Sequence, residues 1–272
     1  KSALKSYAVA AATVATTDTK LFGLIPMSIP STHDQIMSFA SANVPNIANS
    51  TAILEIGAND VMNAIPDILD NKLSIGSFAK SLSDKVVSQL QMLKSAGFKN
   101  IYVANIPPLD KIPLMIMQKQ TKEARTIVSA YNQLLLAKTD IWAKASNISN
   151  FAMLDMNMFL QTALSKTVTN ALGISDTTNS CVGGEILELL TGSSSWTSLL
   201  DSEFNIKEAI VCSDPQAHFF WDPLHPADRV HRLFGYYVNV VITERIRGNT
   251  VTLSEDLLIQ LISKHKLNTI PP

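Results

Sequence analysis

Short apolar runs that alternate with helical patterns are the feature that most limits how this chain can fold. Four runs are rich in apolar residues and are followed by small or polar ones, as buried parallel strands are. They are residues 6–13 (SYAVAAAT), 51–57 (TAILEIG), 100–106 (NIYVANI) and 151–156 (FAMLDM). Residues 77–96 and 119–145 instead repeat apolar side chains three and four positions apart, which predicts amphipathic helices. This order predicts an α/β fold, an open parallel sheet with helices on both faces and functional groups beyond the carboxyl ends of the strands.

A single domain accounts for the length and composition of the chain. Its 272 residues fit one large α/β unit, and an apolar fraction of 46% is enough for a buried core. Residues 175–195 (SDTTNSCVGGEILELLTGSSS) are interpreted as an irregular excursion rather than a linker. We therefore expect one domain over residues 1–272.

Charge and hydropathy exclude several classes of partner. The formal net charge is -1 and both signs are scattered along the chain, so there is no basic face for nucleic acid. No apolar run approaches the roughly 20 residues that cross a bilayer. The opening stretch (KSALKSYAVAAATVATT) lacks the continuous apolar segment and cleavage site of a secretory signal, so any signal is expected to be gone already. The expected partner is small or neutral.

Two cysteines and two glycosylation triplets leave the cellular compartment open. Cys181 and Cys212 could pair or could be buried free thiols. The triplets that begin at Asn49 and Asn147 fit the N-glycosylation pattern, but such triplets arise by chance in most chains of this length.

An aspartate and a histidine lie three residues apart in residues 219–231 (FFWDPLHPADRVH). They follow a strand-like stretch and precede a helix whose first turn could hold Pro226. In such a turn the Asp222 carboxylate can accept a hydrogen bond from His225 Nδ1, which directs Nε2 outward as a general base. The alternative is that Asp222 caps the helix and His225 is a satisfied core imidazole.

A second candidate is residues 55–60 (EIGAND), at the end of a predicted strand. The strand ends at Gly57, and after the small Ala58 the carboxamide of Asn59 could donate to a developing oxyanion. The alternative is a helix start that Asn59 or Asp60 caps.

Together these stretches resemble the GDSL esterase/lipase family, the secreted branch of the SGNH hydrolases. The resemblance covers essentially the whole chain and is carried by YAVAAAT, IGAND, ANIPPLDKIP and FFWDPLHPADRVH. It implies a serine ester hydrolase without a cofactor, acting on acyl or acetyl esters of a lipid or a carbohydrate. It also implies a three-layer, doubly wound parallel sheet of the SGNH, flavodoxin-like order 2-1-3-4-5. A Cys181–Cys212 disulfide is implied as well, with a secreted or extracellular location or, alternatively, a vacuolar one.

The resemblance assigns a role to each matching residue. His225 would be the base and Asp222 the residue that orients it. The Asn59 side chain and the backbone N–H of Ala11 would be the oxyanion donors. The nucleophile of the family is the serine of a Gly-Asp-Ser block that follows the first strand.

The chain departs from the family pattern in two places. Ala11 stands where the family has glycine, and the resemblance assigns a donor there that survives at negative φ but is in doubt at positive φ. The second departure is that no Gly-Asp-Ser or Gly-x-Ser-x-Gly occurs among the ten glycines, so this chain has no identifiable nucleophile. Ser77 and Ser193 each follow a glycine, but one opens a helix and the other lies in a serine-rich loop.

Other histidines and aromatic residues carry weaker signals. The remaining histidines show no metal-ligand spacing, so no metal site is expected, and His231 is interpreted as a packing residue. They are His33, His218, His231 and His265. Four aromatic residues could line an acyl pocket or belong to the core. They are Trp196, Phe219, Phe220 and Trp221.

Three functional interpretations remain open at this point. The first is a secreted serine ester hydrolase whose serine lies on another polypeptide. The second is a pseudoenzyme that serves for binding or storage on the same scaffold. The third is a cytosolic small-molecule binder in which the two motifs are coincidental. The presence of a base, its orienting acid and an oxyanion donor in one chain favours the ester hydrolase, because a scaffold freed from catalysis has no chemical reason to keep all three.

The absent first strand leads to a further expectation. In the order 2-1-3-4-5 this strand lies between residues 7–12 and 52–56. Its loss would leave two strands about 9–10 Å apart with unpaired backbone groups in the core. We therefore expect the chain to be the larger product of a precursor cut before Lys1, with a short N-terminal fragment that carries the first strand and Gly-Asp-Ser docked beside it.

Overall fold

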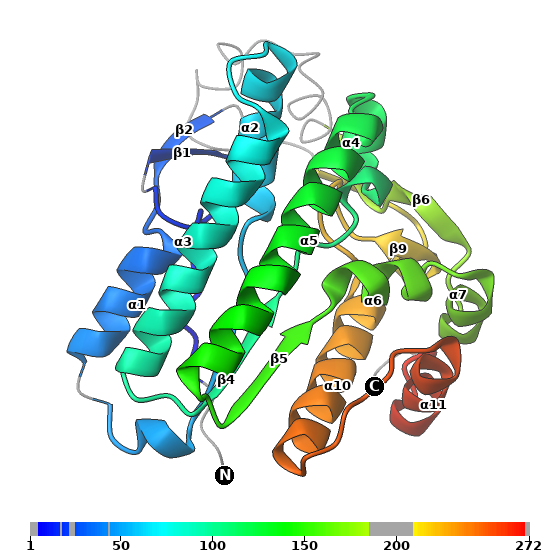
Figure 1. Ribbon diagram of the computed structural model, residues 1–272. Helices are drawn as coiled ribbons and strands as arrows, with labels where there is room; N and C mark the ends of the chain where they lie inside the picture. Colours follow the sequence, from blue (N-terminus) through cyan, green and yellow to red (C-terminus); the bar gives the residue numbers. More distant parts are fainter. Residues whose placement is uncertain (1–4, 17, 22–24, 43, 185–208, 270–272) are drawn as a thin grey trace. The chain divides into compact units, whose positions relative to one another are not determined.

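The computed structural model describes residues 5–16, 18–21, 25–42, 44–184 and 209–269 (Figure 1). The chain forms two compact units. One comprises Lys1–Pro107 and Glu123–Met156, and the other comprises Pro108–Lys122 and Asn157–Pro272. In the parts that the structure describes, no helix is both long and apolar enough to cross a membrane. One hydrolase domain over residues 1–272 stays a prediction.

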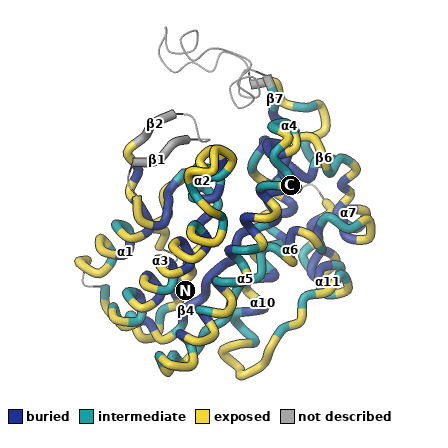
Figure 2. The backbone as a smooth tube through the Cα atoms, turned by 45° about the horizontal axis from the view of Figure 1, so that its top comes forward, coloured by how far each residue is buried: buried dark blue, intermediate teal, exposed yellow. Residues whose placement is uncertain are grey.

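The first unit is built on a three-stranded parallel sheet. Strands β3 (Thr51–Leu54), β4 (Asn100–Ala104) and β5 (Asn150–Leu154) pair in this order. The central strand β4 is buried along most of its length (Figure 2), whereas β3 alternates exposed and buried residues. The three apolar runs predicted these strands, and their order agrees with the one that the resemblance implied. The α/β class with a parallel sheet is confirmed.

Long amphipathic helices pack around this sheet. Figure 1 draws α3 and α5 side by side, and the indole Nε1 of Trp142 on α5 donates to Gln91 Oε1 on α3 at 3.1 Å. The predicted helices at residues 77–96 and 119–145 are confirmed, with ends shifted by one or two positions. The helices of this unit are α1 (Thr32–Ser41), η1 (Ile47–Asn49), α2 (Ala58–Leu69), α3 (Ile75–Ser95) and α5 (Thr121–Ser146).

The strand expected at residues 6–13 is wrong. These residues have no strand pairing, and a turn lies at Ala10 and Ala11. A run of alanines has weak β-propensity, and a strand also needs a neighbour with which to pair. The nearest strands in sequence, β1 (Asp18–Leu21) and β2 (Ile25–Ser28), instead form an antiparallel pair with each other.

The second unit holds two separate strand pairs and several helices. Strands β6 (Asp176–Ser180) and β9 (His218–Phe220) are parallel, and β7 (Val182–Gly184) and β8 (Ala209–Val211) are antiparallel. The irregular segment expected at residues 175–195 is therefore wrong for β6 and β7, and residues 185–195 lie outside the described residues. The helices are η2 (Leu109–Lys111), α4 (Pro113–Met117), α6 (Met156–Ala163), α7 (Lys166–Leu172), η3 (Pro215–Ala217), α10 (Asp228–Ile246) and α11 (Glu255–His265).

Aromatic rings form part of the core of the second unit. Phe159 on α6 lies 4.9 Å from Phe234 and 5.5 Å from Tyr237, both on α10, measured between ring centroids. Phe219 and Phe220 on β9 are fully buried. These two rings therefore belong to the core, whereas the neighbouring Trp221 is 42% exposed.

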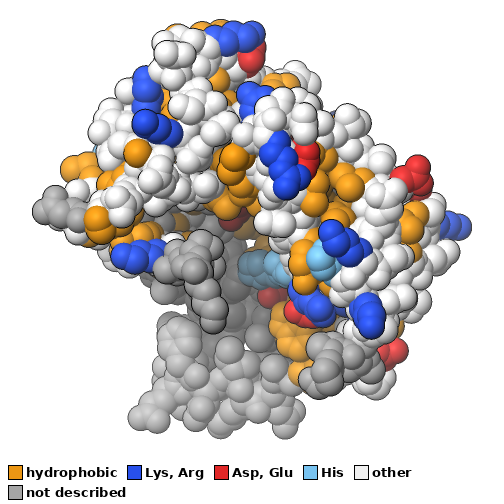
Figure 3. All heavy atoms as spheres, turned by 90° about the horizontal axis from the view of Figure 1, so that it is seen from below, with side chains coloured by type: hydrophobic (Ala, Val, Ile, Leu, Met, Phe, Trp, Pro, Cys, Tyr) orange, Lys and Arg blue, Asp and Glu red, His pale blue; other side chains and the backbone are white. Residues whose placement is uncertain are grey.

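The described part of the surface carries charges of both signs (Figure 3). On the face that Figure 3 presents, basic and acidic side chains are scattered among hydrophobic ones. This agrees with the net charge of -1.

Candidate functional site

Asp222 and His225 lie in a tight turn between β9 and α10. The turn is closed by a hydrogen bond from Trp221 N to His225 O at 2.9 Å and by a bridge between Phe220 and Pro226. Helix α10 begins only at Asp228, so the expectation that Pro226 lies in its first turn is wrong. Proline fits the observed position because the bridge lies at the end of a short strand, where a missing N–H is tolerated.

The carboxylate of Asp222 organises this turn. Its Oδ1 accepts hydrogen bonds from the backbone N–H groups of Leu224 at 2.7 Å and His225 at 2.8 Å. Pro223 O in turn accepts from Leu114 N on α4 at 3.0 Å, which ties the turn to a neighbouring helix. Asp222 therefore caps a turn and is not the N-cap of α10, a position that Ala227 holds.

The same carboxylate contacts the imidazole ring of His225. Nδ1 lies 2.8 Å from Asp222 Oδ2 and 3.0 Å from Oδ1. An ionised carboxylate can only accept, so Nδ1 carries the hydrogen and proton transfer falls to Nε2. The His225 side chain is 63% exposed, so the alternative of a satisfied core imidazole is wrong.

The pKa of Asp222 keeps the pair in this state. Burial alone would raise it, but the hydrogen bond and charge of His225 and the N–H groups of Leu224 and His225 hold the pKa of Asp222 below its ordinary value. The acid therefore stays ionised at neutral pH and can stabilise an imidazolium at His225.

In the first unit, residues 57–60 join the end of β3 to the start of α2. Gly57 is the N-cap of α2 at a φ of 114°, a conformation that favours glycine. A Cβ at this position would lie 3.1 Å from the Ile106 side chain. The Asn59 carboxamide donates through Nδ2 to Ala12 O at 3.0 Å, which fixes the orientation of the amide. An amide nitrogen has two hydrogens, so this bond leaves the second one for an oxyanion.

Asp60, the next residue of α2, binds the same N-terminal segment two residues further on, at Val14. Its two carboxylate oxygens accept from Val14 N at 3.1 and 3.3 Å. Burial raises the pKa of Asp60 to about 6. The backbone N–H groups of Val14 and Asp60 and the charge of Lys85 lower the pKa, but they only partly offset the effect of burial. As a whole residue Asp60 keeps partial exposure, so the burial applies to its carboxyl end. The sequence analysis considered Asp60 only as a helix cap and missed this contact.

The φ of Ala11 is 61°, in the left-handed region. This is the condition under which the sequence analysis placed the oxyanion donor at this position in doubt. For a residue with a Cβ the conformation costs about 1–2 kcal/mol. The role of the Ala11 N–H stays a prediction.

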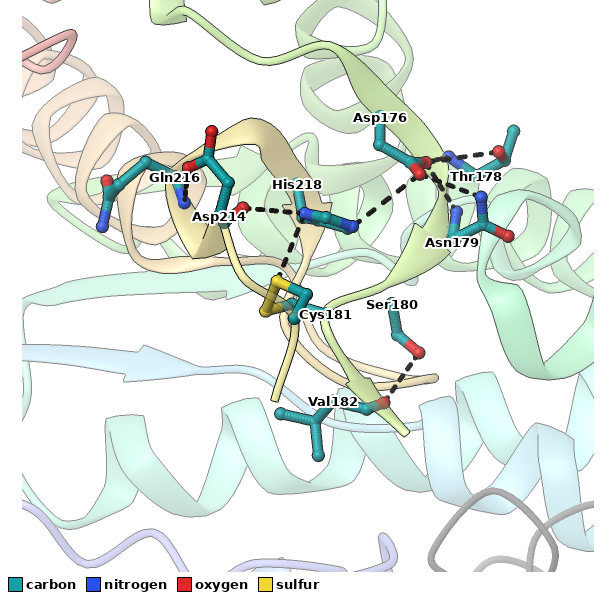
Figure 4. A network of polar contacts seen from close by, with 10 residues as sticks. Asp176, Thr178, Asn179, Ser180, Cys181, Val182, Asp214, Gln216 and His218 are labelled. Carbon is teal, nitrogen blue, oxygen red and sulfur yellow. Dashed lines mark hydrogen bonds and ion pairs between the residues drawn. A yellow bond between two sulfur atoms is a disulfide. The ribbon is translucent and has the colours of Figure 1, made fainter. Parts of the chain in front are cut away.

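The disulfide that the resemblance implied is present. Cys181 and Cys212 are bonded and close a loop with a sequence separation of 31. Figure 4 shows His218 beside the disulfide, with Nδ1 3.5 Å from Cys212 Sγ and 3.0 Å from Asp214 O. Its Nε2 faces Asp176 Oδ2 at 3.8 Å.

The cluster around the disulfide also contains an acid with a low pKa. Burial would raise the pKa of Asp176, but hydrogen bonds from Asn179 and Thr178 and the charge of His218 lower it to about 2. Cys181, Cys212 and His218 form the one described cluster with a metal-like arrangement. Both sulfurs are engaged in the disulfide, which leaves no thiolate to bind a metal.

The remaining sequence candidates have other roles. Ser77 lies in the first turn of α3, where its Oγ accepts from Ser74 Oγ at 2.9 Å and its backbone N–H donates to the N-cap Ser74 Oγ at 3.2 Å. His231 is exposed on α10, so its interpretation as a packing residue is wrong. His33 is exposed on α1, and His265 stacks on Tyr236 at 3.6 Å between ring centroids. Ser193 and Trp196 lie outside the described residues.

Comparison with known proteins identifies the family. The family model described as GDSL-like Lipase/Acylhydrolase matches residues 3–238. The chain is 28% identical over 194 residues to the protein named GDSL esterase/lipase At5g03610 from Arabidopsis thaliana, covering 68% of this chain and 51% of the relative. It is 24% identical over 198 residues to GDSL esterase/lipase At5g45950 from the same plant, covering 69% and 50%.

A third relative gives the same result. GDSL esterase/lipase At2g30310 from Arabidopsis thaliana is 23% identical over 213 residues, covering 74% of this chain and 55% of the relative. The chain thus spans about half the length of the curated relatives that it matches. With the match to the family model over most of its length, the chain belongs to the GDSL-like lipase/acylhydrolase family.

Proposed function

We propose that this chain is the larger part of a serine hydrolase of acyl or acetyl esters. The observation that carries the proposal is the Asp222–His225 pair, whose Nδ1 contact at 2.8 Å prepares the imidazole to accept a proton at Nε2. The substrate class is an ester of a lipid or an acetylated carbohydrate. The names of the relatives, GDSL esterase/lipase, support the reaction type.

The proposed reaction assigns one step to each residue. The serine oxygen attacks the ester carbonyl carbon while its proton passes to His225 Nε2, and Asp222 stabilises the resulting imidazolium. The Asn59 amide and the Ala11 N–H donate to the oxyanion. The imidazolium then protonates the departing alcohol, and water activated by His225 hydrolyses the acyl-serine and releases the acid.

The serine itself is proposed to come from a separate N-terminal fragment of the same precursor. Within the described residues β3 pairs with β4 alone, so its other edge can accept a strand. Ile53 on β3 is 52% exposed, and Tyr7 and Val9 are 37% and 41% exposed. A docked strand would satisfy the open edge and cover apolar surface, as strand addition does in other proteins.

An extracellular or vacuolar location is also proposed. A disulfide persists in oxidising compartments. Asn49 and Asn147 are both exposed, as glycan acceptors must be. Removal of N-glycans by an amidase should lower the mass of the native protein, and an unchanged mass would contradict glycosylation.

The test compares two histidine variants of the native material, with any fragment that accompanies it. His225→Ala should abolish hydrolysis of a p-nitrophenyl ester, because loss of the base costs several decades in rate. His231→Ala is the matched control on α10 and should stay within a few-fold of the wild type. Equal effects of the two substitutions would remove His225 from the role. No activity in the wild type would favour the pseudoenzyme.

A further inference from the structure

Asp60 is a buried acid that the proposed reaction does not use. Within the described chain, Lys85 on α3 acts on it by charge alone, without a hydrogen bond to the carboxylate. On α5, Tyr131 faces the same region. Burial, and then the negative charge of Asp60, raise the pKa of the Tyr131 hydroxyl, which is fully buried without a hydrogen-bond partner in the described residues. An ionised carboxylate in such surroundings costs free energy unless it is paired or hydrogen-bonded, so its role depends on what its hydrogen bonds hold in place.

The hydrogen bonds of Asp60 complete a clamp on the segment that follows Ala11. Asp60 accepts from Val14 N, while Val14 O accepts from three donors on the other side. These donors are His33 N at 3.2 Å, Thr32 Oγ1 at 3.1 Å and Gln89 Nε2 at 2.5 Å.

Two further bonds hold the residues before Val14. Thr13 O accepts from Thr32 N at 3.0 Å, and Ala12 O accepts from Asn59 Nδ2 at 3.0 Å. Residues 12–14 are therefore fixed by side chains and backbone from α1, α2 and α3. Ala11 comes directly before them in a costly conformation, and such conformations persist where the surroundings impose them. Among these partners, Asp60 is the acceptor for the Val14 N–H.

We propose that Asp60 is a positioning residue that holds the turn at Ala11 through the N–H of Val14, so that the backbone donor and Asn59 keep the geometry that oxyanion binding needs. The inference rests on the proposed ester hydrolase function, and it assigns Asp60 no contact with the substrate. Misplacement of such donors by about 1 Å can lower the rate of the chemical step about 100-fold, whereas substrate binding, which does not use them, is expected to change little.

The test uses two substitutions at Asp60 and one control on the same helix. Asp60→Ala removes the acceptor, Asp60→Asn keeps an acceptor oxygen without the charge, and Asp67→Asn changes an exposed acid of α2. For Asp60→Ala we expect kcat per folded molecule to fall about 100-fold with little change in KM. Asp60→Asn should recover to within about 10-fold of the wild type, and Asp67→Asn should match it. A folded Asp60→Ala protein with wild-type kcat, or equal losses in Asp60→Ala and Asp60→Asn, would overturn the inference.

Amide hydrogen exchange separates this inference from the proposed function. The Val14 N–H should exchange at least about tenfold faster in Asp60→Ala than in the wild type and close to the wild-type rate in Asp60→Asn. If the wild type has no esterase activity, the proposed function fails and the exchange measurement alone decides. An unchanged Val14 rate in Asp60→Ala would then overturn the positioning role too.

Discussion

The charge of Asp60 should lower the stability of the folded chain at neutral pH. Its pKa rises from the ordinary 3.8 to about 6 on folding. At about 1.36 kcal/mol per pKa unit, the ionised carboxylate disfavours the folded state by about 3 kcal/mol. Because the folded pKa is the higher one, the folded state binds more protons between the two pKa values. The stability that comes from this extra bound proton is fully present below about pH 4 and is lost as the pH rises through about 6.

Asp60→Asn removes this titration while it keeps an acceptor for Val14 N. We expect the stability of the wild type, relative to the variant, to fall by about 2 kcal/mol between pH 4 and pH 8. Urea unfolding at a series of pH values measures this difference. Any effect of the new amide on stability that does not depend on pH cancels when the values at pH 4 and pH 8 are subtracted. Asp67→Asn, at an exposed position, should follow the wild type.

The direction of the pH dependence decides the outcome. A wild type that gains stability over Asp60→Asn as the pH rises from 4 to 8 would mean that the carboxylate is favoured by the fold. A constant difference would mean that Asp60 does not titrate differently in the two states. Either result would refute the account of this residue as a buried acid kept for its hydrogen bond and not for stability.

Three further outcomes follow from the geometry. Ala11→Gly should raise the free energy of unfolding by about 1 kcal/mol, because glycine adopts the positive φ at this position without the steric cost of a Cβ, whereas Ala10→Gly should lower it slightly. Urea unfolding curves of the two variants that shift in the same direction would contradict this. Asn59→Ala should lower kcat on p-nitrophenyl esters roughly 10²–10³-fold with little change in KM, and an unchanged kcat would return Asn59 to a purely structural role. Replacing Cys181 and Cys212 together by alanine should lower the free energy of unfolding by about 3–4 kcal/mol, and a loss below about 1 kcal/mol would argue against the loop-closure reasoning.

The sequence predicted the parts of the fold that depend on local pattern. Strands β3, β4 and β5 form a parallel sheet in which β4 is the most buried, and each comes from a short apolar run, while α3 and α5 repeat apolar residues on a helical period. The Asp222–His225 contact was predictable because the two residues lie three positions apart in one turn. The pairing of the two cysteines came from the resemblance, since spacing alone left free thiols open.

The sequence could not predict what depends on distant partners. Residues 6–13 are apolar enough for a strand, but the backbone of Ala12 and Val14 is bound by side chains 46 and 47 positions away on α2 and 75 positions away on α3. No local pattern encodes such a clamp. Asp60 was ambiguous for the same reason, because a helix cap and a long-range acceptor have the same local sequence.

Labelling of the native material with a fluorophosphonate tests the central claim most directly, since this probe modifies only an activated serine. The account predicts one labelled serine, in a Gly-Asp-Ser segment outside these 272 residues, and loss of labelling in His225→Ala. Mass spectrometry of the labelled peptide locates the serine, and denaturing conditions separate a docked fragment from this chain. A label on a serine of this chain would contradict the docked fragment, and a wild-type protein that takes up no label would contradict the hydrolase itself.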